Sequence, residues 1–207
     1  RLTGGCAWGR PVSNHPVFFF IFLGRSLLFI LYGVGSVGKS SVARAFQGLM
    51  ERPFLHVAMD DFIGMLPPRL LGHPDGLEFV PEIADGYPAM AIRGGPVMGR
   101  LMHGMRHAVA ALAGQGNDLI VDDVMLDAAD ARAYRALLAG CDVRLVGLFA
   151  PLEVLEERER ARGDRAIGLA RWQYGRVHRN MDYDLELDTA GMTPEQVARG
   201  IRDAFAL

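Results

Sequence analysis

A glycine-rich segment that contains the only lysine of the chain carries the strongest chemical signal in the sequence. Residues 33–40 match the pattern Gly-x-x-x-x-Gly-Lys-Ser/Thr, and of the 22 lysine and arginine residues only Lys39 is a lysine. In that pattern successive backbone N–H groups surround a phosphate, the ammonium reaches the β- and γ-phosphates, and the Ser40 hydroxyl can ligate Mg²⁺. The sequence therefore predicts a phosphate-binding loop, whose members are Gly33, Val34, Gly35, Ser36, Val37, Gly38, Lys39 and Ser40.

The segments on either side of this loop support the prediction. Residues 26–32 form a short apolar run, which is typical of a strand buried on both faces, and residues 41–50 carry apolar side chains at helical spacing. A strand, a loop and a helix in this order place the phosphates at a helix N-terminus, where the helix dipole and free N–H groups favour an anion. The alternative is a glycine-rich turn that binds nothing, and the flanking elements argue against it.

Acidic residues follow two further predicted strands. Asp60 and Asp61 come after the strand at 53–59, and Asp122 and Asp123 end the apolar run of the strand at 118–124. Asp122 could hold Mg²⁺ opposite Ser40, whereas Asp123 should point the other way. Asp60 could accept a proton from an acceptor hydroxyl that attacks the γ-phosphate. For all four residues the alternative is an ordinary role at a turn or at the start of the next helix.

Arginines cluster in residues 158–165, four of them in eight positions. Arg162 and Arg165 flank a glycine at which a predicted helix ends. Phosphoryl transfer needs cations at the transferring group, and an Arg-bearing segment that closes over the site supplies them while it excludes water. We therefore interpret Arg162 and Arg165 as lid residues. We interpret Arg158 and Arg160 as part of a solvated helix face, where i,i+3 and i,i+4 pairs with Glu156 and Glu159 account for part of the run.

Strands and helices alternate along the chain and must position these residues. We expect strands at 26–32, 53–59, 118–124, 142–149 and 183–187, and helices at 41–50, 97–113, 127–139, from 151 and from 193. This order predicts an α/β fold with a five-stranded parallel sheet covered by helices on both faces. Ligands bind such sheets beyond the carboxyl ends of the strands, where the loop and both Asp pairs lie. Residues 63–96 are rich in Gly and Pro, and we interpret them as a long functional insert outside the core.

Composition narrows the class of protein and its compartment. A formal net charge of −2 in 207 residues gives no electrostatic case for nucleic acid. We interpret Cys6 and Cys141 as free thiols of a reducing compartment, which favours a cytoplasmic protein. Residues 17–32 are shorter than the roughly 20 apolar residues that span a bilayer, and Arg25 interrupts them, so we do not favour a membrane protein.

We treat residues 1–24 as an N-terminal extension that could be a leader, an edge element or a remnant, and residues 25–207 as one domain. The sequence indicates no particular oligomeric state.

Together these segments resemble the chloramphenicol phosphotransferases, which are P-loop kinases that phosphorylate a hydroxyl of that antibiotic. The resemblance covers about residues 26–190, and its stretches are 33–41, 57–60, 76–79, 120–124, 161–165 and 183–189. It implies a three-layer P-loop kinase fold with an Arg-bearing lid at about 162–175, Asp60 as the catalytic base, and Ser41 as a further loop residue. It also implies that the loop after Thr189 lies near the adenine. A role in antibiotic resistance is a further implication of the resemblance. Residues 63–96, which should contact the acceptor, depart from the family pattern except near Glu78 and Phe79.

The sequence thus predicts a kinase that uses ATP and Mg²⁺ and transfers the γ-phosphate to a hydroxyl of a small molecule, with a chloramphenicol-type antibiotic as the leading acceptor. One alternative is a P-loop kinase for another small metabolite, such as a sugar acid or a nucleoside. Another is a non-catalytic ATP-binding regulatory protein, which would bind nucleotide and transfer nothing. A GTP switch is excluded, because the guanine motif Asn-Lys-x-Asp needs a second lysine.

Overall fold

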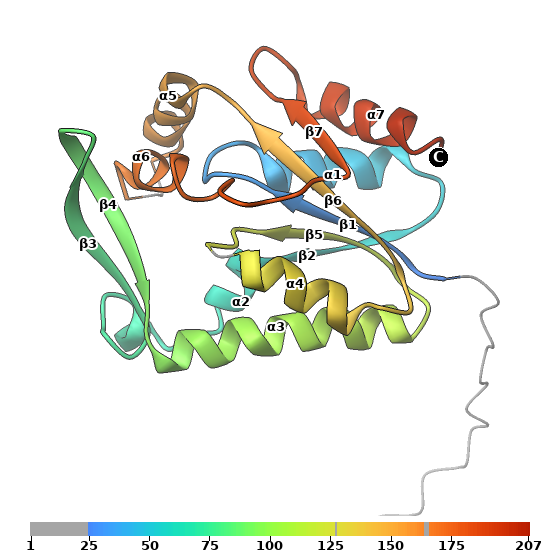
Figure 1. The fold of residues 1–207 in the computed structure, drawn as a ribbon, viewed down its shortest axis with the longest axis horizontal. Coiled ribbons are helices and arrows are strands. Elements are labelled where there is room, and N and C mark those ends of the chain that lie inside the picture. The colour runs from blue at the N-terminus through green and yellow to red at the C-terminus, as the bar shows by residue number, and fades with distance from the viewer. Residues whose placement is uncertain (1–24, 127, 164–165) are drawn as a thin grey trace, which may run out of the picture.

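The computed structural model of the protein describes residues 25–126, 128–163 and 166–207. In these residues the core is a parallel sheet of five strands in the order β2-β5-β1-β6-β7 (Figure 1). The strands are β1 (Leu27–Tyr32), β2 (Phe54–Ala58), β5 (Asp118–Asp123), β6 (Asp142–Phe149) and β7 (Leu185–Asp188). The predicted fold is confirmed, and the strand boundaries agree within about two residues.

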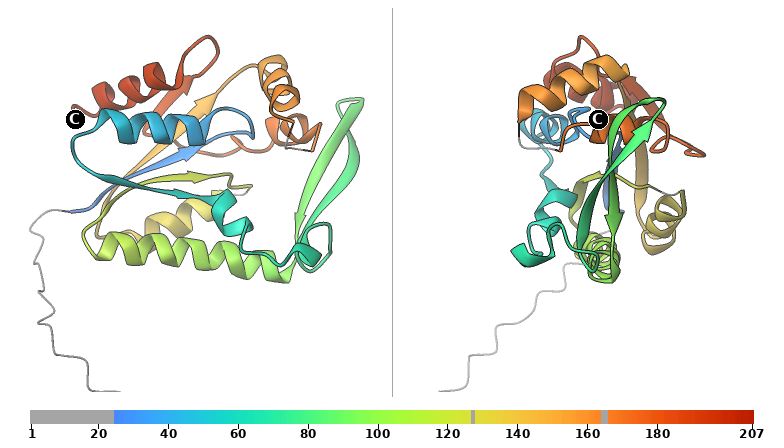
Figure 2. Two further views of the ribbon diagram at one scale, coloured as in Figure 1. Left: turned by 180° about the vertical axis from the view of Figure 1, so that it is seen from behind. Right: turned by 90° about the vertical axis from the view of Figure 1, so that its left-hand side faces the viewer.

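Helices cover both faces of this sheet, as expected (Figures 1 and 2). The helices α1 (Lys39–Leu49) and α7 (Pro194–Ala204) lie side by side on one face, and α3 (Pro96–Gly114) and α4 (Ala128–Leu137) lie on the other. Three further helices, α2 (Met59–Ile63), α5 (Leu152–Arg162) and α6 (Leu169–Tyr174), lie toward the end of the sheet at which β1 enters the phosphate loop. A short 3₁₀ turn, η1, spans Pro68–Leu70.

The core forms around β1, whose six residues are all buried. Phe29 packs its ring against Phe46 of α1, Phe54 of β2 and Phe205 beyond α7, with ring centroids 5.2, 5.9 and 5.3 Å away. Because β1 is the central strand and is buried on both faces, it gives the phosphate loop that follows it a rigid base.

The ends of two helices show how local sequence sets their position. Helix α1 begins at Lys39, two residues earlier than expected, because Gly38 has a left-handed backbone (φ 102°) and ends the loop directly before the lysine. Helix α7 begins as predicted, with Thr193 as N-cap and Pro194 at its first position. Thr193 and Gln196 form a capping box there, which satisfies two backbone N–H groups at the start of the helix.

Residues 77–94 form a β-hairpin that the sequence analysis did not predict. Its strands β3 (Leu77–Ala84) and β4 (Tyr87–Gly94) pair with each other and stand apart from the main sheet (Figure 2). Asp85 and Gly86 connect them with φ of 52° and 81°, the two positive values that a type I′ turn requires. The insert therefore lies outside the core sheet as expected, but it has regular structure. An Asp-Gly pair between two eight-residue runs was the available signal, and the Gly and Pro content of the segment obscured it.

Several expectations concern residues outside the described part of the chain. These are the N-terminal extension at 1–24 (which includes Cys6), the first residue of the helix expected at 127–139, and the lid role of Arg165. Within the described ranges, none of the helices has the length and apolar character that crossing a bilayer requires.

Candidate active site

A cavity of about 1010 Å³ opens at the carboxyl ends of β1, β2 and β5. Its lining includes residues 35–42 of the loop and α1, Asp60 and Asp61 at the start of α2, and Asp122 at the end of β5. The three segments that the sequence analysis placed at one edge of the sheet therefore meet in one cavity. The hairpin and α2 contribute one part of its wall, and residues from Thr189 to Val197 contribute another.

The backbone of the phosphate loop, residues 33–40, restricts which residue types fit at two of its positions. A Cβ atom on Gly33 would lie 2.6 Å from the carbonyl oxygen of Leu148 and 2.9 Å from Val37 Cγ1, so no side chain fits at this position. Ser36 has a left-handed backbone (φ 65°), which is uncommon for a residue other than glycine. Such strained positions concentrate at ligand-binding loops, where the surrounding structure holds them in place.

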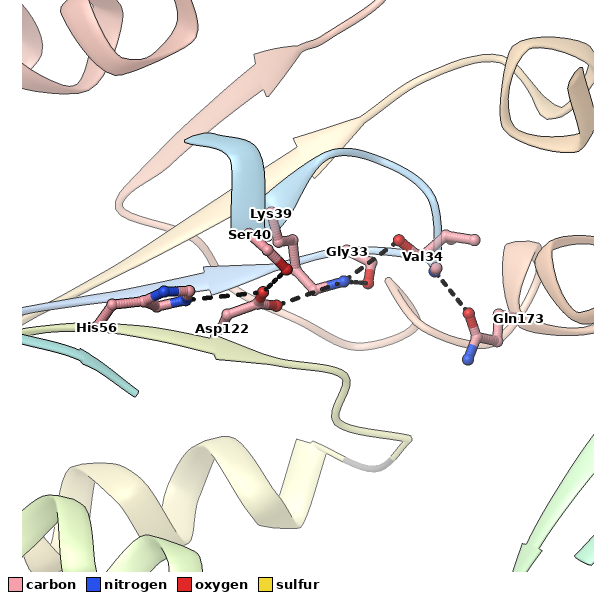
Figure 3. Close-up of polar contacts among 8 residues, drawn as sticks. Gly33, Val34, Lys39, Ser40, His56, Asp122 and Gln173 are labelled. Carbon is pink, nitrogen blue, oxygen red and sulfur yellow. Dashed lines mark hydrogen bonds and ion pairs between the residues drawn. The ribbon is translucent and has the colours of Figure 1, made fainter. Parts of the chain in front are cut away.

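The Lys39 side chain is buried within this loop, with 7 % of its surface exposed. Its Nζ donates hydrogen bonds to the carbonyl oxygens of Gly33 (3.0 Å) and Val34 (3.4 Å) and lies 3.8 Å from Asp122 Oδ1 (Figure 3). A buried ammonium needs such partners, because the loss of its hydration shell is costly. The positive charge that the motif predicts therefore lies in the lining of the cavity.

Ser40 and Asp122 converge beside this ammonium. The Ser40 hydroxyl donates a hydrogen bond to Asp122 Oδ2, and the Asp122 side chain is almost fully buried. A hydroxyl and a carboxylate oxygen in contact form a set of hard ligands that fits Mg²⁺, which usually keeps several waters and binds substrate phosphates as well. The described residues contain no group of three or more His, Cys, Asp or Glu side chains that could hold a metal ion by themselves. An all-protein metal cage is therefore not present among them.

Asp123 points to the opposite side of the sheet, as expected from strand alternation. It accepts a hydrogen bond of 2.9 Å from the hydroxyl of Tyr134 on α4, away from the cavity. Burial raises the pKa of the Asp123 carboxyl, although the Tyr134 bond opposes that shift. Asp123 thus has a structural role under the sheet, and Asp122 alone of the pair lines the cavity.

His56 on β2 also faces the cavity, and the sequence analysis did not single it out. Its Nε2 lies 3.9 Å from Asp122 Oδ2 and is buried with no hydrogen-bond partner among the residues that the structure describes. Burial lowers the pKa of His56, and Arg44 adds to this shift while Asp122 opposes it. The available signal was the strand period of two, which puts His56 and Ala58 on one face of a strand that leads to Asp60.

Asp60 and Asp61 lie in the first turn of α2, directly after β2. Both carboxylates are exposed and both line the cavity. Acidic side chains in the first turn are favourable for the helix dipole, but neither residue has the capping role considered as the alternative, because the N-cap of α2 is Ala58. The structure thus brings Asp60 into the same cavity as Lys39 and Asp122, where an acceptor hydroxyl could meet it.

The arginine-rich segment agrees only in part with its interpretation. Arg162 is the last residue of α5, is exposed and lines the cavity, and Gly163 ends the helix with φ 72°. Arg160 is exposed as expected. The solvated-face interpretation of Arg158 was wrong, because its guanidinium donates to the hydroxyl (3.0 Å) and carbonyl (2.8 Å) of Thr189 and to the carbonyl of Val37 (3.4 Å). Arg158 thus connects the loop after β7 to the phosphate loop.

Glu159 is likewise buried instead of lying on a surface face, with 2 % of its area exposed. Its carboxylate accepts hydrogen bonds from the backbone N–H groups of Gly168 (2.7 Å) and Ala170 (2.8 Å) at the start of α6. Glu156 of the same helix pairs with Arg171 of α6 at 2.6 Å. Both acidic side chains therefore attach α6 to α5, and simple helical spacing could not show this.

Comparisons by sequence match this chain to a protein family and to a named relative. A family model described as "Chloramphenicol phosphotransferase-like protein" matches residues 26–206. The protein named "Putative O-phosphotransferase Rv2636" of Mycobacterium tuberculosis (strain ATCC 25618 / H37Rv) is 31% identical over 183 residues, which are 86% of this chain and 81% of that protein.

Solved structures of low sequence identity share the fold. The tunicamycin resistance protein of Deinococcus radiodurans superimposes with a TM-score of 0.61 and 22% identity, over 88% of this chain and 97% of its own. The APS kinase CysC of Mycobacterium tuberculosis, solved in complex with AMPPNP and APS, gives a TM-score of 0.62 with 18% identity, over 88% and 99% of the two chains. The architecture is therefore that of the P-loop kinases.

Proposed function

This chain belongs to the chloramphenicol phosphotransferase-like family, and on that premise we propose that it is an ATP- and Mg²⁺-dependent kinase acting on a hydroxyl of a small molecule. Family and fold make it a phosphotransferase that uses a nucleotide and a small-molecule acceptor. One observation carries the finer proposal. A single cavity is lined by Lys39, Ser40 and Asp122 in one part and by Asp60 and an apolar wall in another.

The donor side of the cavity is the phosphate loop, residues 33–40 with Ser41 beyond it. In the proposed complex its backbone N–H groups and the Lys39 ammonium bind the β- and γ-phosphates of ATP. Ser40 and Asp122 would hold Mg²⁺, which when bound neutralises charge on the β- and γ-phosphate oxygens. We place the adenine against Met192, Pro194 and Val197, which line the same cavity after β7.

On the acceptor side we assign Asp60 as the general base. The acceptor oxygen forms a bond to the γ-phosphorus while the bond from that phosphorus to the β,γ-bridging oxygen breaks, and ADP leaves with that oxygen. The proton of the acceptor hydroxyl passes to the Asp60 carboxylate. Arg162, at the end of α5 beside the cavity, would stabilise the charge on the transferring group. The proposed chemistry is therefore positioning and electrostatics, with one proton transfer.

The acceptor wall is apolar in the part that residues 63–96 supply. Its side chains include Leu71 and Phe79, which are 51% and 41% exposed although they face a cavity, together with Ile63, Leu77 and Ile92. Exposed apolar side chains in a pocket favour a ligand with an apolar body, and a few polar groups then fix its orientation. This supports a chloramphenicol-type antibiotic as the leading acceptor over a sugar acid.

The test incubates the protein with ATP, Mg²⁺ and a panel of hydroxyl compounds, and mass spectrometry scores each compound for an added phosphoryl group. The panel contains chloramphenicol, tunicamycin, a sugar acid and a nucleoside, and the Lys39→Ala variant serves as the control. Phosphorylation of chloramphenicol is the expected result. Transfer to another compound alone would keep the kinase and reject this antibiotic. Binding of ATP with transfer to no compound would favour the non-catalytic binder and contradict the proposal.

A further inference from the structure

Gln173 of α6 contacts the phosphate loop from a part of the chain that the catalytic proposal does not use. Its Oε1 accepts a hydrogen bond of 2.7 Å from the backbone N–H of Gly35, and its side chain is 3% exposed (Figure 3). A Cβ atom on Gly35 would lie 3.1 Å from this Oε1, which is tighter than nine in ten real Cβ contacts, so glycine leaves the room that the amide needs. The direction of one loop N–H is therefore set by a residue on α6.

The same helix is bonded to the hairpin that forms part of the acceptor wall. The Met90 N–H of β4 donates to the carbonyl of Gly168 at 3.0 Å, and Trp172 Nε1 donates to the Glu82 carboxylate of β3 at 3.1 Å. The backbones pack closely there, because a Cβ atom on Gly168 would lie 3.0 Å from the Cα of Ala89. Helix α6 lies between the hairpin and α5 in Figure 1. A shift of the hairpin would therefore move α6.

We propose that Gln173 is a positioning residue that couples the acceptor-side hairpin (residues 77–94) to the phosphate loop through α6. The inference rests on the proposed function, because it takes the loop as the nucleotide site and the hairpin as the acceptor wall. An acceptor that moves the hairpin changes the orientation of the Gly35 N–H and thereby the affinity for nucleotide. Because coupling between two binding sites is reciprocal, a bound nucleotide changes the affinity for the acceptor by the same factor.

The experiment tests this coupling without any acceptor, as a double-mutant cycle on nucleotide binding. Trp172→Phe removes the N–H that bonds the hairpin, and Gln173→Met removes the oxygen that accepts from Gly35. Calorimetry measures the Kd of the unreactive ATP analogue AMPPNP, and NMR measures amide hydrogen exchange at Gly35. We expect Gln173→Met to accelerate amide exchange at Gly35 about tenfold, because a buried N–H loses its partner. We expect it to weaken AMPPNP binding about tenfold, because the Gly35 peptide is no longer held in the orientation of the preorganised loop. We expect Trp172→Phe to weaken binding about threefold in the wild-type background and to have almost no effect in the Gln173→Met background.

Two further variants separate positioning from a general loss of structure. Gln173→Glu keeps an accepting oxygen, so Gly35 exchange should stay as slow as in the wild type even though the added charge weakens AMPPNP binding. Tyr174→Phe changes an exposed residue of the same helix and should leave the Kd unchanged.

Unchanged exchange at Gly35 in Gln173→Met would overturn the proposal, and so would equal effects of Trp172→Phe in both backgrounds. These readouts need no phosphoryl transfer, so they are separate from the acceptor panel. If the protein transfers phosphate but the effects of the two variants on the Kd are additive, only the proposed coupling is rejected. If the protein transfers phosphate to no compound, these measurements can still detect the coupling.

Discussion

Replacing Asp60 by asparagine tests the proposed chemistry most directly, because its neighbour Asp61 offers a matched control. Both carboxylates are exposed, both line the cavity and both lie in the first turn of α2. Each Asp→Asn change preserves the side-chain shape and removes one negative charge from a helix N-terminus, which costs about 0.3–1 kcal/mol of stability. This cost is common to both variants, so the difference between them isolates the role of a base.

The expected difference is large. A general base contributes about 10²- to 10⁴-fold to the rate, which corresponds to about 2.7–5.4 kcal/mol at about 1.36 kcal/mol for each factor of ten. We therefore expect Asp60→Asn to lower kcat by at least about a hundredfold, and Asp61→Asn to lower it by less than about fivefold. The KM for ATP should change little in both, because neither residue belongs to the phosphate loop.

The assay is steady-state phosphoryl transfer to the acceptor that the panel identifies, with both substrates varied. Full activity of Asp60→Asn would remove this residue as the base. Equal losses in the two variants would show that negative charge at the start of α2 matters, and that no specific proton acceptor does.

Three further predictions follow from the same structure. Lys39→Ala should lower turnover by at least about a hundredfold, as expected for one electrostatic group, and initial-rate measurements at saturating ATP would contradict this if turnover were retained. Arg158→Ala should lower the free energy of unfolding by about 1–3 kcal/mol, because its charged hydrogen bonds to Thr189 are lost. Replacement of the exposed Arg160 by alanine is the control and should change that free energy by less than about 0.5 kcal/mol. Urea denaturation of both variants measures the two changes. Burial, with Lys39 adding to it, lowers the pKa of His178 to about 4, so the unfolded chain takes up a proton between about pH 6.5 and 4 that the folded protein does not. The free energy of unfolding should therefore fall by on the order of 2 kcal/mol as the pH is lowered from about 6.5 to 4. An identical fall in the His178→Phe variant would show that another group is responsible.

Much of the fold and part of the candidate site could be predicted from the sequence, because their signals are local. The five strands follow from apolar runs separated by helical patterns, and the phosphate loop follows from spacing within eight residues. The meeting of Asp60 and Asp122 with Lys39 follows from topology, because the carboxyl ends of parallel strands share one edge of a sheet. The family resemblance led to the same conclusions and is confirmed. The hairpin at 77–94 also had a local signal in Asp85 and Gly86, so it could have been predicted.

The remaining features depend on contacts between distant segments. Gln173 reaches Gly35 across 138 positions, and Arg158 reaches Val37 across 121, and no periodicity in either segment indicates these bonds. Glu159 looks like a surface residue by spacing, yet the fold buries it against the start of α6. Residue type and local spacing thus determined which residues are candidates for the chemistry and the edge of the sheet where they lie. The tertiary structure alone decided which side chains hold α6 and the phosphate loop in place. Packing brings the hydrogen-bonding groups of these side chains close to their partners and excludes water from the bonds.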